Sequence, residues 1–250
     1  MGYNGVYCPD GEHFLEEKLL KDNPEGIKRF VDFYQHIYYW KNNRSVEKEI
    51  IKLLKKDWNI DFTDEDCFWI LAWKCGGINH QESNDTIATC KNWSSTRIEG
   101  MLCREKVCFK GVSKTINEFR NKITKESIIN EKLEKEVLDL YADTLNKLSE
   151  LKMHIGPTYA TALLYVASRG TIPIYDQYAG RALDYITNFK LNMKSYVLTS
   201  DSNNGYADYF YYIRDIFNKE YENRYSDVES WRAVDQALWA YGHNYCIRNV

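Results

Sequence analysis

The chain has 250 residues, of which 44% are hydrophobic, and this suits one large globular domain or two closely packed lobes. Its formal net charge of −3 argues against a diffuse polycationic nucleic-acid binder, although a local basic patch stays compatible with it. Seven cysteines without a CxxC pair and five scattered histidines match no zinc or iron–sulfur pattern, so we expect reduced thiols, no metal and no cofactor.

Helical signals dominate the first third of the chain. Asn23-Pro24 predicts a helix to about residue 40, because asparagine caps helices and proline suits the first helical position. Ser45 opens a second predicted helix. Thr63-Asp-Glu-Asp66 resembles a capping box ahead of a third helix over residues 67–75. No signal-peptide pattern and no apolar run of membrane-spanning length is present, so we expect a cytoplasmic protein with no membrane partner.

The middle of the chain is the hardest part to interpret. Residues 78–112 show no clear period and are expected to include loops. Residues 104–125 carry seven Lys or Arg and two acids, a local charge of +5. A solvated surface is the ordinary interpretation of such a segment, and a flank that faces phosphates is the more specific hypothesis.

The second half of the chain is also predicted to be helical. Apolar residues recur at spacings of three and four over 124–153, which indicates a long amphipathic helix. Further helices are predicted over 157–168, 176–188, 205–220 and 227–246. The first of them is expected to have one inner face, formed by Ala160, Leu163, Leu164 and Tyr165. Tyr196–Thr199 is a candidate short strand within a polar loop. The fold class is therefore all-α, and no linker divides residues 1–250.

A predicted turn at His154-Ile-Gly-Pro157 joins two of these helices. Gly156 permits a tight turn or the close approach of another molecule, and Pro157 suits the first position of the next helix. Exposed N–H groups at such a turn, helped by the helix dipole, form a site for a DNA phosphate. A plain helix–helix turn is the ordinary alternative.

Asp176 follows Gly156 by twenty positions. The segment Thr171-Ile-Pro173 is typical of extended backbone, and Asp176 then stands at the N-cap of the next predicted helix. Capping is the ordinary role of such a residue. By its position alone, Asp176 would indicate nothing more.

Gly156, Ala160 and Asp176 together resemble the helix-hairpin-helix DNA glycosylase superfamily, which includes endonuclease III, adenine DNA glycosylase and 8-oxoguanine DNA glycosylase. The element Pro173-Ile-Tyr-Asp-Gln-Tyr-Ala-Gly-Arg181 is most similar to that of the adenine glycosylases. The strong resemblance covers about residues 145–190. In addition, the closing segment 232–243 is similar to the end of bacterial proteins of the 8-oxoguanine-glycosylase fold.

The resemblance implies two helical lobes with a cleft between them, and a monomer that binds double-stranded DNA containing a damaged, mispaired or modified base. It also implies that Asp176 is the catalytic carboxylate, which stabilises the sugar cation and activates water. The implied DNA-binding hairpin consists of Met153, His154, Ile155, Gly156 and Thr158.

Two residues depart from the family pattern. His154 replaces the first glycine of the hairpin, which makes the backbone there less open to a phosphate. Thr158 stands where bifunctional members carry a nucleophilic lysine, and a threonine forms no Schiff base with the sugar. The resemblance therefore implies a monofunctional glycosylase.

The extruded base needs a pocket, for which Tyr159, Tyr175 and Trp239 are candidates. Core packing is the more common role for each of them. Asp235 is expected to form a buried ion pair with Arg232. A non-catalytic DNA-binding protein or an interaction protein on the same fold is the alternative function. A basic face that spans residues 110–125 and the hairpin at 153–158 would argue against the interaction protein.

Overall fold

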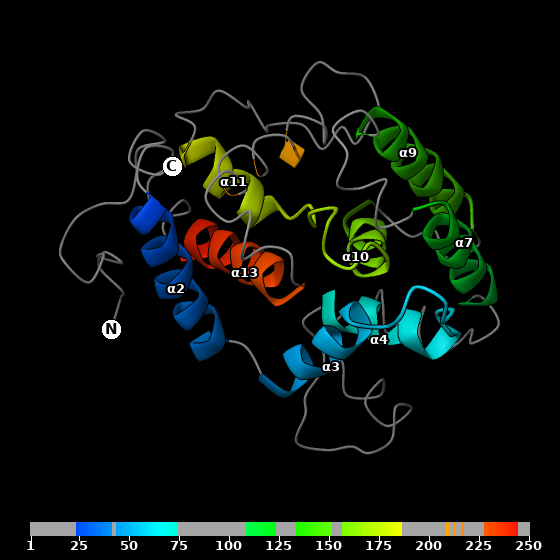
Figure 1. Ribbon diagram of the computed structural model, residues 1–250, viewed down its shortest axis with the longest axis horizontal. Coiled ribbons are helices and arrows are strands. Elements are labelled where there is room, and N and C mark those ends of the chain that lie inside the picture. Colours follow the sequence, from blue (N-terminus) through cyan, green and yellow to red (C-terminus); the bar gives the residue numbers. More distant parts are fainter. Residues whose placement is uncertain are drawn as a thin grey trace. The chain divides into compact units, whose positions relative to one another are not determined.

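The computed structural model describes residues 24–41, 44–74, 109–123, 134–151, 157–186 and 228–244, together with Tyr209, Phe210, Ile213 and Phe217. The helices within these ranges are α2 (Pro24–Lys41), α3 (Arg44–Leu54), α4 (Asp64–Lys74), α7 (Phe109–Lys122), α9 (Glu134–Glu150), α10 (Pro157–Ala167), α11 (Gln177–Ile186) and α13 (Val228–Asn244) (Figure 1). The described residues contain no strand. The all-α class is confirmed for this part of the chain.

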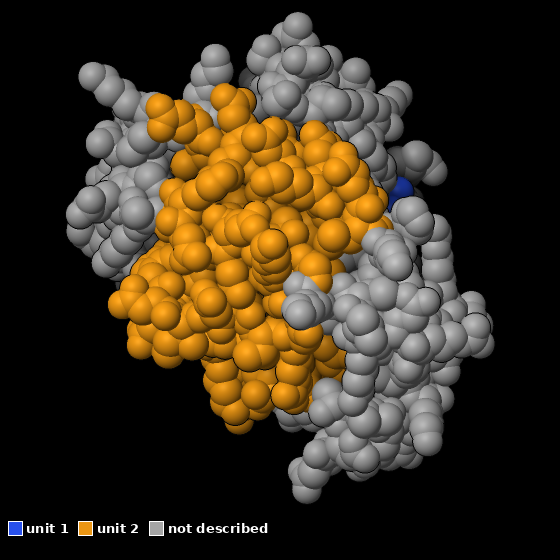
Figure 2. Space-filling model, turned by 90° about the vertical axis from the view of Figure 1, so that its right-hand side faces the viewer, with its two compact units in different colours: residues 1–42, 175–250 blue, residues 43–174 orange. Residues whose placement is uncertain are grey.

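The chain divides into two compact units. Unit 1 consists of residues 1–42 and 175–250, and unit 2 consists of residues 43–174, drawn in orange in Figure 2. The segment that leads from α10 to α11 therefore passes from one unit to the other. Asp176 belongs to unit 1, whereas α10 belongs to unit 2.

Unit 2 is built around α10, which packs against α3, α4, α7 and α9. The sequence of α10, PTYATALLYVA, has no charged residue on any side. A helix that is apolar all round is normally buried, and every residue from 160 to 167 is indeed buried. The sequence pattern indicated one inner face on this helix, whereas the neighbouring helices cover all of its faces.

The capping box predicted at the start of α4 is confirmed. The backbone N–H of Thr63 donates to Asp66 Oδ2 at 2.7 Å, and the N–H of Asp66 donates to Thr63 Oγ1 at 3.1 Å. These two bonds satisfy backbone donors that the helix itself leaves without partners. Lys56 Nζ lies 2.5 Å from the same Asp66 oxygen, which ties the loop after α3 to this cap.

The end of α10 is a left-handed turn at Arg169, with φ 55°, and Gly170, with φ 80°. The N–H of Gly170 donates to the carbonyl of Tyr165 at 2.8 Å, the long closing bond of a Schellman motif. Arg169 also places its guanidinium carbon 5.8 Å from the centre of the Trp58 ring. This turn ends the central helix of unit 2.

Helix α7 was not predicted, since its first residues fall in the stretch without a clear period. Val112, Ile116 and Phe119 are buried along one side of it. Helix α9 confirms the later part of the predicted long helix, with Val137, Tyr141, Leu145 and Leu148 buried at spacings of three and four. It begins at Glu134, and residues 124–133 lie outside the described part.

In unit 1, α13 packs against both α2 and α11. Aromatic rings fill the contact between α2 and α13, with Tyr241 edge-on to Phe30 at 5.4 Å and to Tyr34 at 5.0 Å. Phe217 adds a ring 6.3 Å from Phe30, and it belongs to a set of buried helical residues with Tyr209, Phe210 and Ile213. Their spacing fits the helix predicted near 205–220. The candidate strand Tyr196–Thr199 lies outside the described residues.

A buried polar group also joins α2 to α13. Arg232 forms an ion pair with Asp235, as the sequence predicted, and donates through Nη2 to the Tyr38 hydroxyl at 2.8 Å. Only 2% of Arg232 and 8% of Asp235 is exposed to solvent. Buried charges are stable when they are paired and hydrogen-bonded, and the Tyr38 contact extends this pairing to the neighbouring helix.

Candidate active site

Asp176 stands at the head of α11, with 8% of its surface exposed. Its Oδ1 accepts a hydrogen bond from the backbone N–H of Tyr178 at 2.8 Å, and its carbonyl accepts one from the N–H of Gly180 at 2.8 Å. These are the bonds of an N-cap, so the ordinary role expected for Asp176 is present. A carboxylate has about four lone-pair positions, so capping through one oxygen is compatible with a further role.

The last turns of α13 press directly on the first turn of α11. A Cβ atom added to Gly242 would lie 1.8 Å from the carbonyl oxygen of Tyr178 and 2.6 Å from its carbonyl carbon. Real Cβ atoms do not approach a backbone so closely, and only glycine fits this position. The contact therefore holds the C-terminal end of α13 against the turn that Asp176 caps.

Three half-buried rings gather at this contact, and we name Tyr178, Trp239 and His243 the aromatic cluster. The His243 ring stacks on Trp239, with 4.8 Å between the centroids and 13° between the planes. Tyr178 meets both rings edge-on, at 5.7 Å from Trp239 and 4.8 Å from His243. Tyr38 supports Trp239 from α2 at 5.4 Å.

A positively charged side chain, that of Arg181, lies beside the aromatic cluster. Arg181 is exposed, and its guanidinium carbon lies 5.9 Å from the centre of the Tyr178 ring. Flat rings suit stacking against a base, and an exposed arginine suits a phosphate. Asp176, Tyr178 and Arg181 therefore bring a carboxylate, a stacking surface and a cation to the start of α11.

Of the three candidate pocket residues, the structure places one in this group. Trp239 is a member of the aromatic cluster. Tyr175 is 3% exposed and packs edge-on against Tyr209 at 5.3 Å, so it has the more common role of core packing. Tyr159 is half-buried on α10, in unit 2. Of the hairpin residues, Met153, His154, Ile155 and Gly156 lie outside the described residues, as does the side chain of Thr158.

Sequence reasoning missed Tyr178 and His243. A signal for His243 exists, because Trp239 and His243 are four positions apart on a helix and such residues lie on one face. Tyr178 follows Asp176 by two positions, so it also lies within the first turn of α11. The remaining information, that α13 meets α11 at this turn, comes from tertiary packing.

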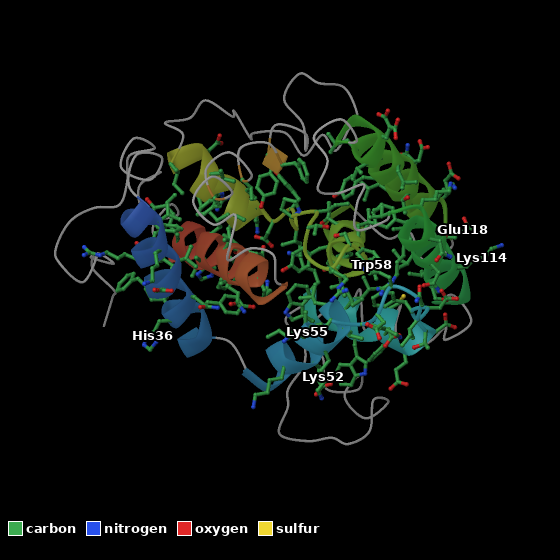
Figure 3. The ribbon with its side chains drawn as sticks, in the orientation of Figure 1. His36, Lys52, Lys55, Trp58, Lys114 and Glu118 are labelled. Atoms are coloured by element: carbon green, nitrogen blue, oxygen red, sulfur yellow. The ribbon has the colours of Figure 1, made fainter. Side chains whose placement is uncertain are left out.

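The basic flank proposed for residues 104–125 is described over 109–123. Lys114 points outward from α7 beside Glu118, with 4.0 Å between Nζ and Oε1 (Figure 3). Arg120 is 2% exposed, and its Nη2 donates to the backbone carbonyls of Lys56, at 2.6 Å, and Asp57. Burial lowers the pKa of Arg120, and the charge of Arg169 lowers it further. One of the seven basic residues is therefore a core residue and adds nothing to a surface patch.

Comparisons with models of protein families, with curated proteins and with solved structures found no match to this chain. Within the described ranges, no group of three or more His, Cys, Asp or Glu side chains is arranged to hold a metal ion. The helices in the same ranges include none that is long and apolar enough to cross a membrane.

Proposed function

We propose that this protein is a monofunctional DNA glycosylase that removes a damaged, mispaired or modified base and uses Asp176 as its carboxylate. The observation that carries the proposal is the placement of Asp176 at the head of α11, two residues before the aromatic cluster begins. The sequence resemblance over residues 145–190 supplies the reaction class. The helical architecture of both units is compatible with it.

The proposed chemistry uses few groups. As the base leaves, positive charge develops on the deoxyribose, and a nearby ionised carboxylate lowers the energy of that state. The same carboxylate orients and deprotonates the water that attacks C1′. The target nucleotide first leaves the duplex, and its base stacks against aromatic side chains. The aromatic cluster offers such a surface beside the carboxylate.

Strand cleavage is not part of the proposed reaction. Thr158 stands in α10 at the position where the resemblance would place a lysine nucleophile. A hydroxyl group forms no Schiff base with the opened sugar, so the product is an intact strand with an abasic site. Borohydride reduction during turnover should trap no protein–DNA adduct, and a trapped adduct would show that an amine elsewhere in the chain acts as nucleophile.

The decisive test compares Asp176→Asn with the unchanged protein. Asparagine caps helices about as well as aspartate, so this variant keeps the fold and removes only the charge. Duplexes that carry 8-oxoguanine, mispaired adenine, uracil or alkylated bases are incubated with each protein and then cleaved with alkali at abasic sites. We expect base release by the unchanged protein and a loss of at least about 100-fold in the variant. Equal activity of the two proteins would contradict the mechanism.

A non-catalytic DNA-binding or interaction protein on the same fold is the second candidate. The burial of Arg120 and the pairing of Lys114 with Glu118 favour the interaction protein of these two, because both reduce the positive charge that α7 offers to DNA. The salt dependence of DNA binding distinguishes a DNA-binding protein from an interaction protein. Contacts with phosphates give an affinity that falls steeply with salt, whereas an interaction protein shows no such dependence.

A further inference from the structure

Two guanidinium groups of unit 2 meet at the ring of Trp58, which is half-buried in the loop between α3 and α4 (Figure 3). The guanidinium carbon of Arg120, on α7, lies 5.1 Å from the centre of this ring. That of Arg169, just after α10, lies 5.8 Å from the same centre. Three segments that are far apart in the sequence therefore bring two cations to one ring.

Arg169 reaches this ring from a strained backbone. Its φ of 55° lies in the left-handed region, which residues other than glycine rarely adopt, and such strain is concentrated at functional sites. Within the described part of the chain, its guanidinium forms no ion pair or hydrogen bond. The carbonyls of Tyr165 and Ser168, at the end of α10, instead accept from backbone N–H groups and hydroxyls. The side chain of Arg169 thus retains its donors for a ligand.

Arg120 also has an unused donor, although it is 2% exposed. Its Nη2 donates to the carbonyls of Lys56 and Asp57 and its Nε to that of Trp58, whereas its buried Nη1 has no hydrogen-bond partner. A buried donor without an acceptor is unfavourable. Burial lowers the pKa of Arg120, and the charge of Arg169 lowers it further. The two guanidinium groups are therefore close enough to repel each other.

Nearby carboxylates balance these charges only in part. Three of them act on the pKa of Arg120 in the opposite direction without reversing its shift: Asp61, Asp57 and Asp66. Asp66 is already held in an ion pair, and Asp57 and Asp61 are exposed, where water weakens their field. None of the three forms an ion pair with Arg169. An anion bound beside Trp58 would offset the repulsion that remains.

We propose that Arg169, Arg120 and Trp58 form a site in unit 2 for a phosphate monoester. The planar fork of Arg169 binds two phosphate oxygens at once, and the Trp58 ring holds that guanidinium in place. Arg120 contributes the second positive charge. A monoester carries about −1.5 to −2 near neutral pH, which matches two guanidinium groups, whereas each phosphodiester of a DNA backbone carries one negative charge. The site goes beyond the proposed function and does not depend on it.

Calorimetric titration of the full-length protein with adenosine 5′-monophosphate tests the site, and adenosine is the control that lacks the phosphate. We expect the monophosphate to bind and adenosine not to bind. Arg169→Gly removes the guanidinium and relieves the left-handed backbone, so we expect it to fold. Its affinity for the monophosphate should fall at least about tenfold, as for the loss of hydrogen bonds to a charged group. Arg169→Lys keeps the charge without the fork, and its affinity should be intermediate.

Lys114→Gln is the matched control, since Lys114 is an exposed cation on α7 in the same unit (Figure 3). It removes the same charge and should retain the affinity of the unchanged protein. An equal loss in Lys114→Gln and Arg169→Gly would show general attraction of anions and would overturn the site. Equal affinity of Arg169→Gly and the unchanged protein would also overturn it. Thermal melting by circular dichroism confirms that each variant is folded.

Trp58 provides a second measurement. Orthophosphate bound at Arg169 changes the surroundings of the Trp58 ring, so it should change the tryptophan fluorescence of the unchanged protein. Trp58→Phe keeps a ring beside the two cations and should lose this change. A fluorescence change that persists in full in Trp58→Phe would locate the phosphate elsewhere and would contradict the assignment.

Two sources can supply the monoester, a free nucleotide or the 5′ end of a DNA strand. The same titration compares one oligonucleotide with a 5′-phosphate and with a 5′-hydroxyl. Tighter binding of the phosphorylated strand that is lost in Arg169→Gly would assign the site to a strand end. Equal binding of the two strands, with binding of adenosine 5′-monophosphate, would assign it to a free nucleotide. If the monophosphate, orthophosphate and the 5′-phosphate all fail to bind, the inference fails and the proposed glycosylase function is unaffected.

Discussion

The helix at the centre of unit 2 and the last helix of unit 1 use buried surface in different ways. Helix α10 has no charged residue, and its neighbours cover it on every side. Helix α13 combines buried aromatic rings with a buried ion pair, and its last turn presents two half-buried rings, Trp239 and His243. The comparison teaches that the buried part of α10 forms the core of unit 2, whereas α13 both stabilises unit 1 and forms part of the candidate site.

The largest expected effect tests the contact between α13 and α11. Gly242→Ala places a Cβ against the Tyr178 carbonyl, so α13 must move away, and we expect a destabilisation above about 4 kcal/mol. Gly111→Ala in unit 2 is the matched control, because its Cβ would meet only the side chain of Leu151, at 3.2 Å. Replacing a helical glycine gains up to about 1 kcal/mol of helix propensity, so we expect little net change there. Urea unfolding of both variants measures the difference.

A smaller effect is expected for the buried arginines, one in each unit. Arg232→Met leaves the carboxylate of Asp235 buried without its ion-pair partner, which typically costs about 3–5 kcal/mol. Arg120→Met removes hydrogen bonds to the backbone carbonyls of Lys56 and Asp57, at a cost of about 1–3 kcal/mol. Chemical denaturation of the two variants shows which of them loses more free energy of unfolding. A larger loss for Arg120→Met would show that the loop after α3 depends on its guanidinium more than α13 depends on the ion pair.

Removal of the N-cap of α11 is expected to lower stability by a still smaller amount. Asp176→Ala removes the acceptor for the Tyr178 N–H and should cost about 1 kcal/mol, whereas Asp176→Asn should cost little. Both variants should lose base release. Activity that followed stability, with Asp176→Asn fully active, would assign Asp176 to capping alone.

The smallest expected effect is the chemical modification of the Cys67 thiol in unit 2 of the native protein. Burial raises the pKa of this thiol, and the charges of Asp66 and Asp64 raise it further, so the reactive thiolate is suppressed at neutral and mildly alkaline pH. Iodoacetamide should modify Cys67 only after unit 2 unfolds, as peptide mass spectrometry would show. Rapid modification of the native protein would show that α4 opens readily.

Local patterns in the sequence predicted most of the helices. The capping box at Thr63, the Asn23-Pro24 start and the three-and-four spacing before Leu148 are short-range features, and each specifies structure through neighbours along the chain. The candidate site depended on long-range packing. Asp176 was identified by its spacing from Gly156. The neighbours of His243 follow from the contact between α13 and α11, and a sequence does not display that contact.

The sequence pattern also underestimated how many faces of α10 are buried. An amphipathic interpretation assigns one face to the core, and it fails when helices cover every side. Helix α7 was missed because its apolar residues, Val112, Ile116 and Phe119, are set among seven charged or amide side chains that mask the period. Arg120 belongs to the same helix and is buried, although a charge-based interpretation placed it at the surface.

The left-handed turn at Arg169 sets backbone strain against a side-chain contact. A non-glycine residue in this conformation costs about 1 kcal/mol, and glycine would remove that strain. Arginine gives a different advantage, because its guanidinium lies over the half-buried ring of Trp58 and next to the carbonyl end of α10. Arg169→Gly would therefore relieve backbone strain and at the same time remove the cation from the Trp58 ring, so its two effects on stability oppose each other.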